Sequence, residues 1–142
     1  MIDADPIPPV EDDELLARFL VNKDDFRADK TVRPRAFLPF SYVELSVNRH
    51  RDSNEQELWE IGQQVALLRD RTLHGRTDIL ASDCRIEPLD VKAHPLAKPK
   101  DPIDNPNHAN VVDYPAAKED QMSLAQKLAD KAGKHLSPPN IA

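Results

Sequence analysis

Prolines set the strictest limit on where this chain can form regular structure. The sequence holds 13 prolines against 3 glycines. Most of them fall in two groups: Pro6, Pro8 and Pro9, then Pro95, Pro99, Pro102 and Pro106. Proline lacks the backbone N–H that helices and sheets use, and it disfavours a helical conformation in the residue before it. We therefore expect a flexible, acidic, proline-rich tail over residues 1–12 and an extended crossing over residues 93–106.

The rest of the chain has the size and composition of one small domain. Of its 142 residues, 39% are hydrophobic and 31% are charged, an apolar share below the ~45–50% of typical globular chains. We predict one domain over residues 13–135 and a second flexible tail over 136–142. No apolar run is long enough for a membrane span or a secretory signal. The single cysteine, Cys84, cannot form a disulfide within the chain, so we expect a cytoplasmic protein.

Hydrophobic periodicity predicts an α+β fold with a small mixed or antiparallel sheet. Alternation is clearest in VELSVNRH, residues 43–50, where Val43, Leu45 and Val47 share one face. The segment 15–22 fits a helical stripe as well as a strand, and we favour a short acidic helical turn that passes into a strand around residues 17–22. The complete set of expected strands covers residues 17–22, 43–49, 77–81, 85–91 and 109–112.

Two main helices are expected to pack on this sheet. The first covers residues 55–70 and begins at a capping box formed by Asn54 and Glu57. Gly62 inside it costs about 1 kcal/mol relative to alanine, which indicates that a neighbouring element approaches closely there. The second helix covers residues 116–133. The expected buried stripe of the first helix is Leu58, Ile61, Val65 and Leu68, and that of the second is Met122, Ala125, Ala129 and Ala132.

Arginine is concentrated in the middle of the chain. Nine of the ten arginines lie within residues 18–76, whereas seven of the nine lysines lie within residues 77–142. Because arginine binds carboxylate and phosphate groups through a planar fork, we expect any anion-binding surface within 18–76. The alternative is that these arginines pair with neighbouring acids on a solvated surface. The formal net charge of −6 argues against nucleic-acid binding by the chain as a whole.

The segment DNPNHANVVDYP, residues 104–115, places a histidine between asparagines where the proline-rich crossing ends. One interpretation is structural, since asparagine and aspartate before proline initiate turns and can bond the local backbone. The other is functional: His108 would act with His50 as a catalytic pair beside arginines that bind a phosphate or carboxylate. The candidate binding residues are Arg33, Arg35, Arg49, Arg51, Asn107 and Asn110.

The sequence lacks the motifs of common metal and cofactor sites. The five histidines and one cysteine stand in no HExxH, HxH or CxxC spacing. With only three glycines, the chain has no P-loop and no GxGxxG motif. We therefore expect no metal and no cofactor. Cys84 is interpreted as a small core residue, with a nucleophilic thiol as the alternative.

Several segments together resemble a group of short bacterial proteins of uncharacterised function. The shared patterns are ADxTVxPxAFxP, LSVxRH and NPNHANV, present here as ADKTVRPRAFLP (28–39), LSVNRH (45–50) and NPNHANV (105–111). The resemblance covers residues 14 to about 132. It implies a bacterial, cytoplasmic, single-domain protein and carries no activity with it.

Two functions from different classes fit these observations. The first is a non-enzymatic accessory or binding protein that contacts another protein through the arginine-rich middle and the loop 22–40. The second is a small hydrolase or nucleic-acid-processing enzyme that uses a histidine and arginine site for a phosphate-bearing ligand. An enzyme should bring His108, His50 and two arginines into one cleft, whereas a docking protein should show a flat or apolar exposed patch.

Overall fold

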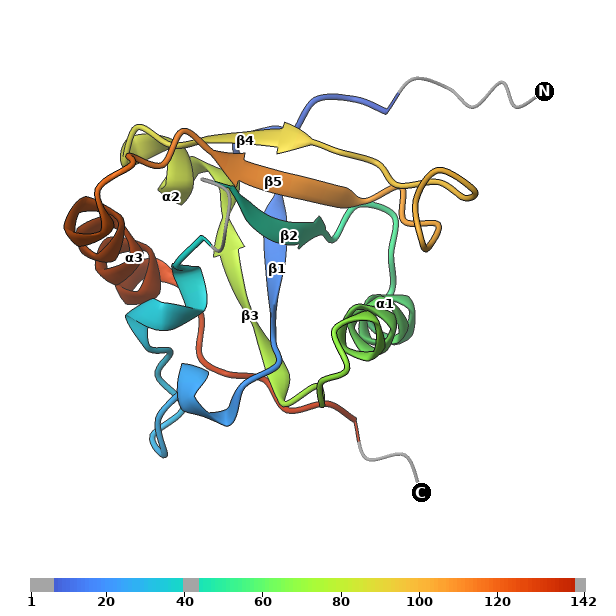
Figure 1. Ribbon diagram of the computed structural model, residues 1–142, viewed down its shortest axis with the longest axis horizontal. Coiled ribbons are helices and arrows are strands. Elements are labelled where there is room, and N and C mark those ends of the chain that lie inside the picture. Colours follow the sequence, from blue (N-terminus) through green and yellow to red (C-terminus); the bar gives the residue numbers. More distant parts are fainter. Residues whose placement is uncertain (1–6, 40–43, 140–142) are drawn as a thin grey trace.

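A computed structural model describes residues 7–39 and 44–139 as a small α+β fold. Five antiparallel strands form one open sheet in the order β3-β1-β2-β5-β4. Helices α1 (Glu55–Leu68) and α3 (Lys118–Lys131) lie on opposite sides of it (Figure 1). Within residues 7–39 and 44–139, no helix is long and apolar enough to cross a membrane. The strands are β1 Leu15–Leu20, β2 Leu45–Arg49, β3 Gly75–Leu80, β4 Asp90–Ala93 and β5 His108–Val112.

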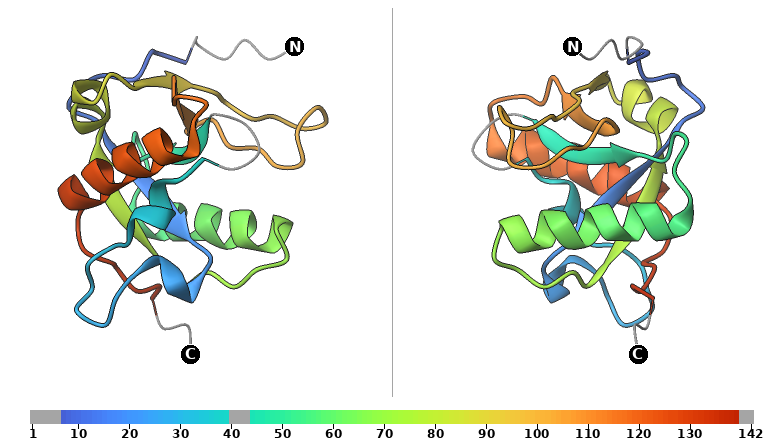
Figure 2. Two further views of the ribbon diagram at one scale, coloured as in Figure 1. Left: turned by 60° about the vertical axis from the view of Figure 1, so that its left-hand side comes forward. Right: turned by 90° about the vertical axis from the view of Figure 1, so that its right-hand side faces the viewer.

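The larger hydrophobic core lies on the side of the sheet that faces α3. This side is also covered by the short helix α2 (Ala81–Ile86) and by the 3-10 turn η2 (Pro34–Phe37), as the two views in Figure 2 show. Full burial of a large apolar side chain contributes about 1.5–3 kcal/mol, so this core is the main source of stability. Its buried members include Leu16, Leu20, Phe37, Leu45, Val47, Ile79, Val91, Val111 and Leu128.

The other side of the sheet is covered by α1 through a smaller core. A Cβ atom added to Gly62 would lie 2.7 Å from Cε1 of Phe19 on β1, which confirms the close approach expected at this glycine. The predicted stripe of α1 is wrong at Leu68, which is 52% exposed. The face of α1 that carries the small residues Gly62 and Ala66 packs against the sheet instead. The buried stripe is therefore rotated around the helix axis relative to the predicted one. The buried residues of α1 are Leu58, Trp59, Gly62 and Ala66.

The strand predicted at 85–91 is wrong for most of its length. The structure has α2 up to Ile86 and then β4 from Asp90. Ala81 and Cys84 are both fully buried in the larger core. Residues three positions apart share a face in a helix but point to opposite faces in a strand, so only a helix buries this pair together. The strand expected at 17–22, by contrast, forms as β1 and pairs with β2 and β3. The helical turn expected before it is wrong at Leu15 and Leu16, which already belong to the strand.

The packed part of the chain extends beyond the domain limits expected from the prolines. Val10 is only 4% exposed, and the carbonyl oxygens of Pro8 and Val10 accept hydrogen bonds from buried or partly buried arginine side chains. At the other end, Leu136 exchanges two backbone hydrogen bonds with Arg76 of β3. Residues 7–12 and 136 therefore belong to the packed structure. The proline-rich segment can contribute because proline lacks the backbone N–H but keeps a carbonyl oxygen that accepts hydrogen bonds. Residues 1–6 lie outside the described part of the chain.

Candidate functional site

The two histidines expected to act as a pair have separate partners. Nε2 of His50 lies 3.0 Å from Oδ1 of Asp78, and the same carboxylate accepts a hydrogen bond from Arg76. Nε2 of His108 lies 2.6 Å from Oγ of Ser46. Within the described residues, no hydrogen bond or ring contact joins His50 to His108. The structure therefore does not bring this pair into direct contact.

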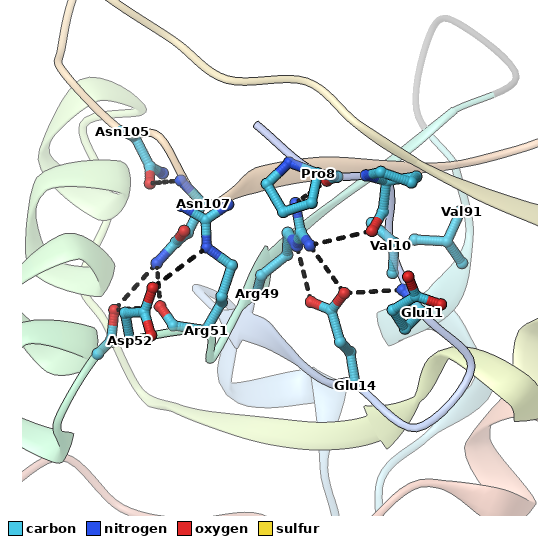
Figure 3. A network of polar contacts seen from close by, with 12 residues as sticks. Pro8, Val10, Glu11, Glu14, Arg49, Arg51, Asp52, Val91, Asn105 and Asn107 are labelled. Carbon is cyan, nitrogen blue, oxygen red and sulfur yellow. Dashed lines mark hydrogen bonds and ion pairs between the residues drawn. The ribbon is translucent and has the colours of Figure 1, made fainter. Parts of the chain in front are cut away.

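Arg49 is buried and is paired with a carboxylate of the same chain (Figure 3). The side chain is 1% exposed, and its Nε and Nη2 atoms donate to the two carboxylate oxygens of Glu14 at 2.7 Å each. Its Nη1 donates to the carbonyl oxygen of Pro8 at 2.8 Å. Burial alone would raise the pKa of Glu14, but the hydrogen bonds and charge of Arg49 lower it overall. Arg49 thus fastens the N-terminal segment to β2 and is engaged within the protein.

The asparagines of NPNHANV connect the turn before β5 to the end of β2. Nδ2 of Asn107 donates to the carbonyl oxygen of Arg51 at 2.7 Å and to Oγ of Ser53 at 3.0 Å (Figure 3). Nδ2 of Asn105 donates to Oδ1 of Asn48 at 2.8 Å, and both residues are buried. These contacts agree with the structural interpretation of the motif.

The other predicted binding residues lie apart from one another. Nε of Arg51 lies 3.6 Å from a carboxylate oxygen of Asp52, and Asn110 stands opposite Ser46 in the β2–β5 pair. Arg33 is exposed and has no ion pair within the described residues. Of the predicted set, only Arg35 lines a groove that lies near the C-terminal ends of β1 and α1.

This groove has a volume of about 940 Å³ and combines positive charge with apolar walls. It is formed by the end of β1, the loop that follows β1, and the C-terminal end of α1. Asp25 is the only acid among the described residues of the lining, and its carboxylate lies 3.2 Å from Nε of Arg35. Burial raises the pKa of this carboxyl group. The cationic residues of the lining are Arg18, Arg35, Arg69 and Arg71, and the apolar residues are Phe19, Val21, Leu38 and Pro39. We call it the arginine groove.

Arg18 lies at the inner side of the arginine groove, where β1 and β2 separate. The two strands pair only at Leu16 with Arg49 and at Ala17 with Asn48. Beyond these pairs, Nε of Arg18 donates to the carbonyl oxygen of Ala36 at 2.8 Å. Its Nη1 donates to the carbonyl oxygen of Ser46 at 2.9 Å. The guanidinium group thus bonds one backbone acceptor of β2 and one of the 3-10 turn η2.

Arg18 differs from the other buried arginines because it has no carboxylate partner. Arg18 is 7% exposed, Arg49 1% and Arg76 2%. Arg49 forms an ion pair with Glu14. Arg76 forms ion pairs with Glu55 and Asp78. Within the described residues, the side-chain hydrogen bonds of Arg18 go to carbonyl oxygens. Burial, together with the nearby charge of Arg69, lowers the pKa of Arg18 to about 10, although the charge of Asp25 offsets part of this effect. A buried cation that no carboxylate hydrogen-bonds is energetically costly, and groups with shifted pKa values are common at binding sites.

Metal ligands and reactive thiols do not gather in the described parts of the chain. Across residues 7–39 and 44–139, no group of three or more His, Cys, Asp or Glu side chains is placed to hold a metal ion. Cys84 is fully buried, and burial raises the pKa of its thiol to about 12. Since the thiolate is the reactive form of cysteine, Cys84 is a core residue.

The groove residues Arg18, Arg69 and Arg71 are absent from the set predicted by sequence. A signal for Arg18 exists in LLARFL, residues 15–20, where one arginine interrupts a strand that is apolar on both faces. Such a strand must bury its arginine. No comparable signal exists for Arg69 and Arg71, because their position near β1 depends on how α1 packs on the sheet.

Known proteins offer no assignment for this arrangement. No protein-family model matches the chain, and neither a curated protein nor a solved structure matches it significantly. The residues of the chain itself must therefore carry the functional argument.

Proposed function

We propose that this protein is an accessory or binding protein that takes an acidic segment of a partner protein into the arginine groove. The observation that carries this proposal is the buried guanidinium of Arg18 at the inner side of the groove, whose hydrogen bonds within the described residues go to carbonyl oxygens and not to a carboxylate. A carboxylate from a partner would give Arg18 what Glu14 gives Arg49, namely a charge-assisted hydrogen bond in a protected position. Arg35, Arg69 and Arg71 would attract the segment and hold its other acidic groups.

The composition of the groove favours a protein segment over other anions. Phe19, Val21, Leu38 and Pro39 give it apolar walls that inorganic phosphate would not use. A peptide with interspersed acidic and apolar side chains uses both kinds of wall. The net charge of −6 disfavours a nucleic acid. A phosphate-bearing small ligand is the second class that the arginines fit, and titration with phosphate distinguishes it from the peptide.

The alternative function suggested by the sequence, a hydrolase that uses His50, His108 and arginines together, receives less support. That hypothesis needs His50, His108 and arginines in one cleft, but neither histidine lines the arginine groove. Arg49 is engaged by Glu14, and His50 is engaged by Asp78. These contacts support a binding role for the groove.

A bacterial, cytoplasmic location is part of the same proposal. The single cysteine excludes a disulfide within the chain, and its thiol is buried in the core. A chain stabilised without disulfides suits a reducing compartment. The bacterial origin rests on the resemblance of the ADKTVRPRAFLP, LSVNRH and NPNHANV segments.

Isothermal titration calorimetry with a synthetic peptide of alternating glutamate and leucine tests the binding role. We expect binding by the wild-type protein that weakens as salt is added. The double variant Arg69→Ala, Arg71→Ala should bind about ten-fold more weakly or worse, because hydrogen bonds to charged groups contribute about 1.5–3 kcal/mol. Arg33→Ala is the matched control, since Arg33 is exposed and lies outside the groove lining. Equal affinities of the double variant and the wild type would overturn the proposal.

A further inference from the structure

Ser46 and His108 form a hydrogen-bonded pair that the binding role does not use. Ser46 lies on β2 and His108 on the neighbouring strand β5, where His108 stands opposite Asn48. Oγ of Ser46 and Nε2 of His108 are 2.6 Å apart, a short distance for a hydrogen bond. Both residues are half-buried. A serine hydroxyl in direct contact with an imidazole nitrogen is the basic unit of a serine nucleophile and its general base.

The second ring nitrogen of His108 fixes the direction of that hydrogen bond. Nδ1 of His108 lies 2.8 Å from the carbonyl oxygen of His94 and 3.1 Å from Nδ1 of the same residue. A carbonyl oxygen only accepts hydrogen bonds, so Nδ1 of His108 carries the proton and Nε2 carries the lone pair. Ser46 therefore donates its hydroxyl proton toward His108. Burial lowers the pKa of His108, which keeps the ring in the neutral form that a general base requires.

A small cavity lined in part by Ser46 adjoins the arginine groove. Ser46 lines a cavity of about 20 Å³ in the gap between β1 and β2, room for about one water molecule. Arg18, Phe19, Val21 and Arg69 line both this cavity and the groove, so the two spaces adjoin. The positively charged guanidinium of Arg18 thus borders the same space as the serine.

We infer that Ser46 is a nucleophile that accepts an acetyl group from a small ester, with His108 as its general base and the His94 carbonyl oxygen orienting the ring. Oγ of Ser46 attacks the ester carbonyl carbon while its proton passes to Nε2 of His108. The bond to the leaving alcohol then breaks, and the alcohol leaves with the proton from His108. Water, deprotonated by the same Nε2 atom, attacks the acetyl-serine, releases acetic acid and restores Ser46.

Turnover of p-nitrophenyl acetate by the purified full-length chain tests this inference. We expect release of nitrophenol above the background rate, and peptide mapping by mass spectrometry should find an acetyl group on Ser46. Ser46→Ala and His108→Asn should each lower the rate by about 10²-fold or more. Ser82→Ala is the matched control, because Ser82 lies on α2 in the described structure and away from the cavity lining. A wild-type rate equal to that of Ser46→Ala, or acetyl groups on lysines alone, would refute the inference.

A second measurement is independent of whether the variants fold. The ¹⁵N chemical shifts of the His108 ring in the folded wild-type protein report which nitrogen is protonated. The inference requires a protonated Nδ1 and an unprotonated Nε2. The opposite tautomer would rule out His108 as the base even if both variants unfold. Because neither experiment uses the acidic peptide, their outcome does not depend on that of the proposed binding role.

Discussion

At the scale of single residues, the three buried arginines of the described chain show that arginine can either organise the fold or leave a charge for a ligand. Arg49 and Arg76 are held by carboxylates from other parts of the chain, so their charge is neutralised within the protein. Arg18 is held only by carbonyl oxygens and borders a groove. Paired buried arginines organise the fold, whereas an unpaired one leaves a charge that a ligand can neutralise.

Removal of the Glu14 carboxylate should destabilise the protein strongly. Glu14→Ala leaves the guanidinium of Arg49, 1% exposed, without its counter-charge. Breaking a buried pair in this way typically costs about 3–5 kcal/mol in the free energy of unfolding. Urea denaturation measures the change, and Glu11→Ala is the control because the Glu11 side chain is exposed. A loss for Glu14→Ala no larger than that for the control would show that Arg49 does not need this partner.

His108 should make stability depend on pH in the mildly acidic range. Burial lowers the pKa of His108 below its ordinary value of 6.5, so the unfolded chain binds a proton more readily than the folded protein does. The stability that the neutral ring contributes is therefore present above pH 6.5 and is lost as pH falls through the folded-state pKa. The difference in the free energy of unfolding between the wild type and His108→Gln should shrink over this range. A difference that is constant with pH would contradict the assignment.

At the scale of secondary-structure elements, periodicity predicted well where an element has one clearly apolar face. The capping box at Asn54 and Glu57 is present, and both main helices occur within two residues of their expected ends. The exceptions have physical causes. The stripe of α1 shifts because Gly62 and Ala66 allow the closest approach to the sheet. The short segment around Cys84 forms a helix because only a helix buries Ala81 and Cys84 together.

The buried face of α1 gives a direct stability test. Leu58 is 2% exposed, whereas Leu68 is 52% exposed at the end of the helix. Leu58→Ala should lower the free energy of unfolding by about 2–5 kcal/mol as a core truncation. Leu68→Ala should change it by no more than about 0.5 kcal/mol, as surface substitutions usually do. Urea denaturation of both variants checks the register, and a larger loss for Leu68→Ala would mean that α1 is rotated on the sheet.

At the scale of the whole molecule, the N-terminal segment should contribute to stability. A truncated chain that begins at residue 13 loses the buried side chain of Val10 and the carbonyl acceptors of Arg49 and Arg85. We expect its melting temperature to fall by several degrees, since full burial of a valine alone contributes about 1.5–3 kcal/mol. Val10→Ser, which keeps the backbone acceptors, should show a smaller drop. An unchanged melting temperature of the truncated chain would show that residues 7–12 pack without stabilising the domain.

The sequence predicted the fold class more fully than it predicted the candidate site. Strand and helix patterns are local, and they lead to the α+β fold directly. The site depends on contacts between distant segments. Arg35 was predicted because it lies in an arginine-rich loop, but Arg69 and Arg71 reach the groove only through the packing of α1 against β1. Ser46 is one of several polar residues in its strand, and only the pairing of β2 with β5 places it against His108.

The central claim is that the buried guanidinium of Arg18 receives a carboxylate from a partner. NMR spectroscopy of the unmodified protein observes the Nε–H signal of each buried arginine during titration with the glutamate–leucine peptide. We predict that the Arg18 signal and the backbone amides of the groove shift together and saturate, while the Nε–H signal of Arg49, already bound to Glu14, stays in place. Shifts confined to other surfaces, or an Arg18 signal that does not respond while the peptide binds, would contradict the claim.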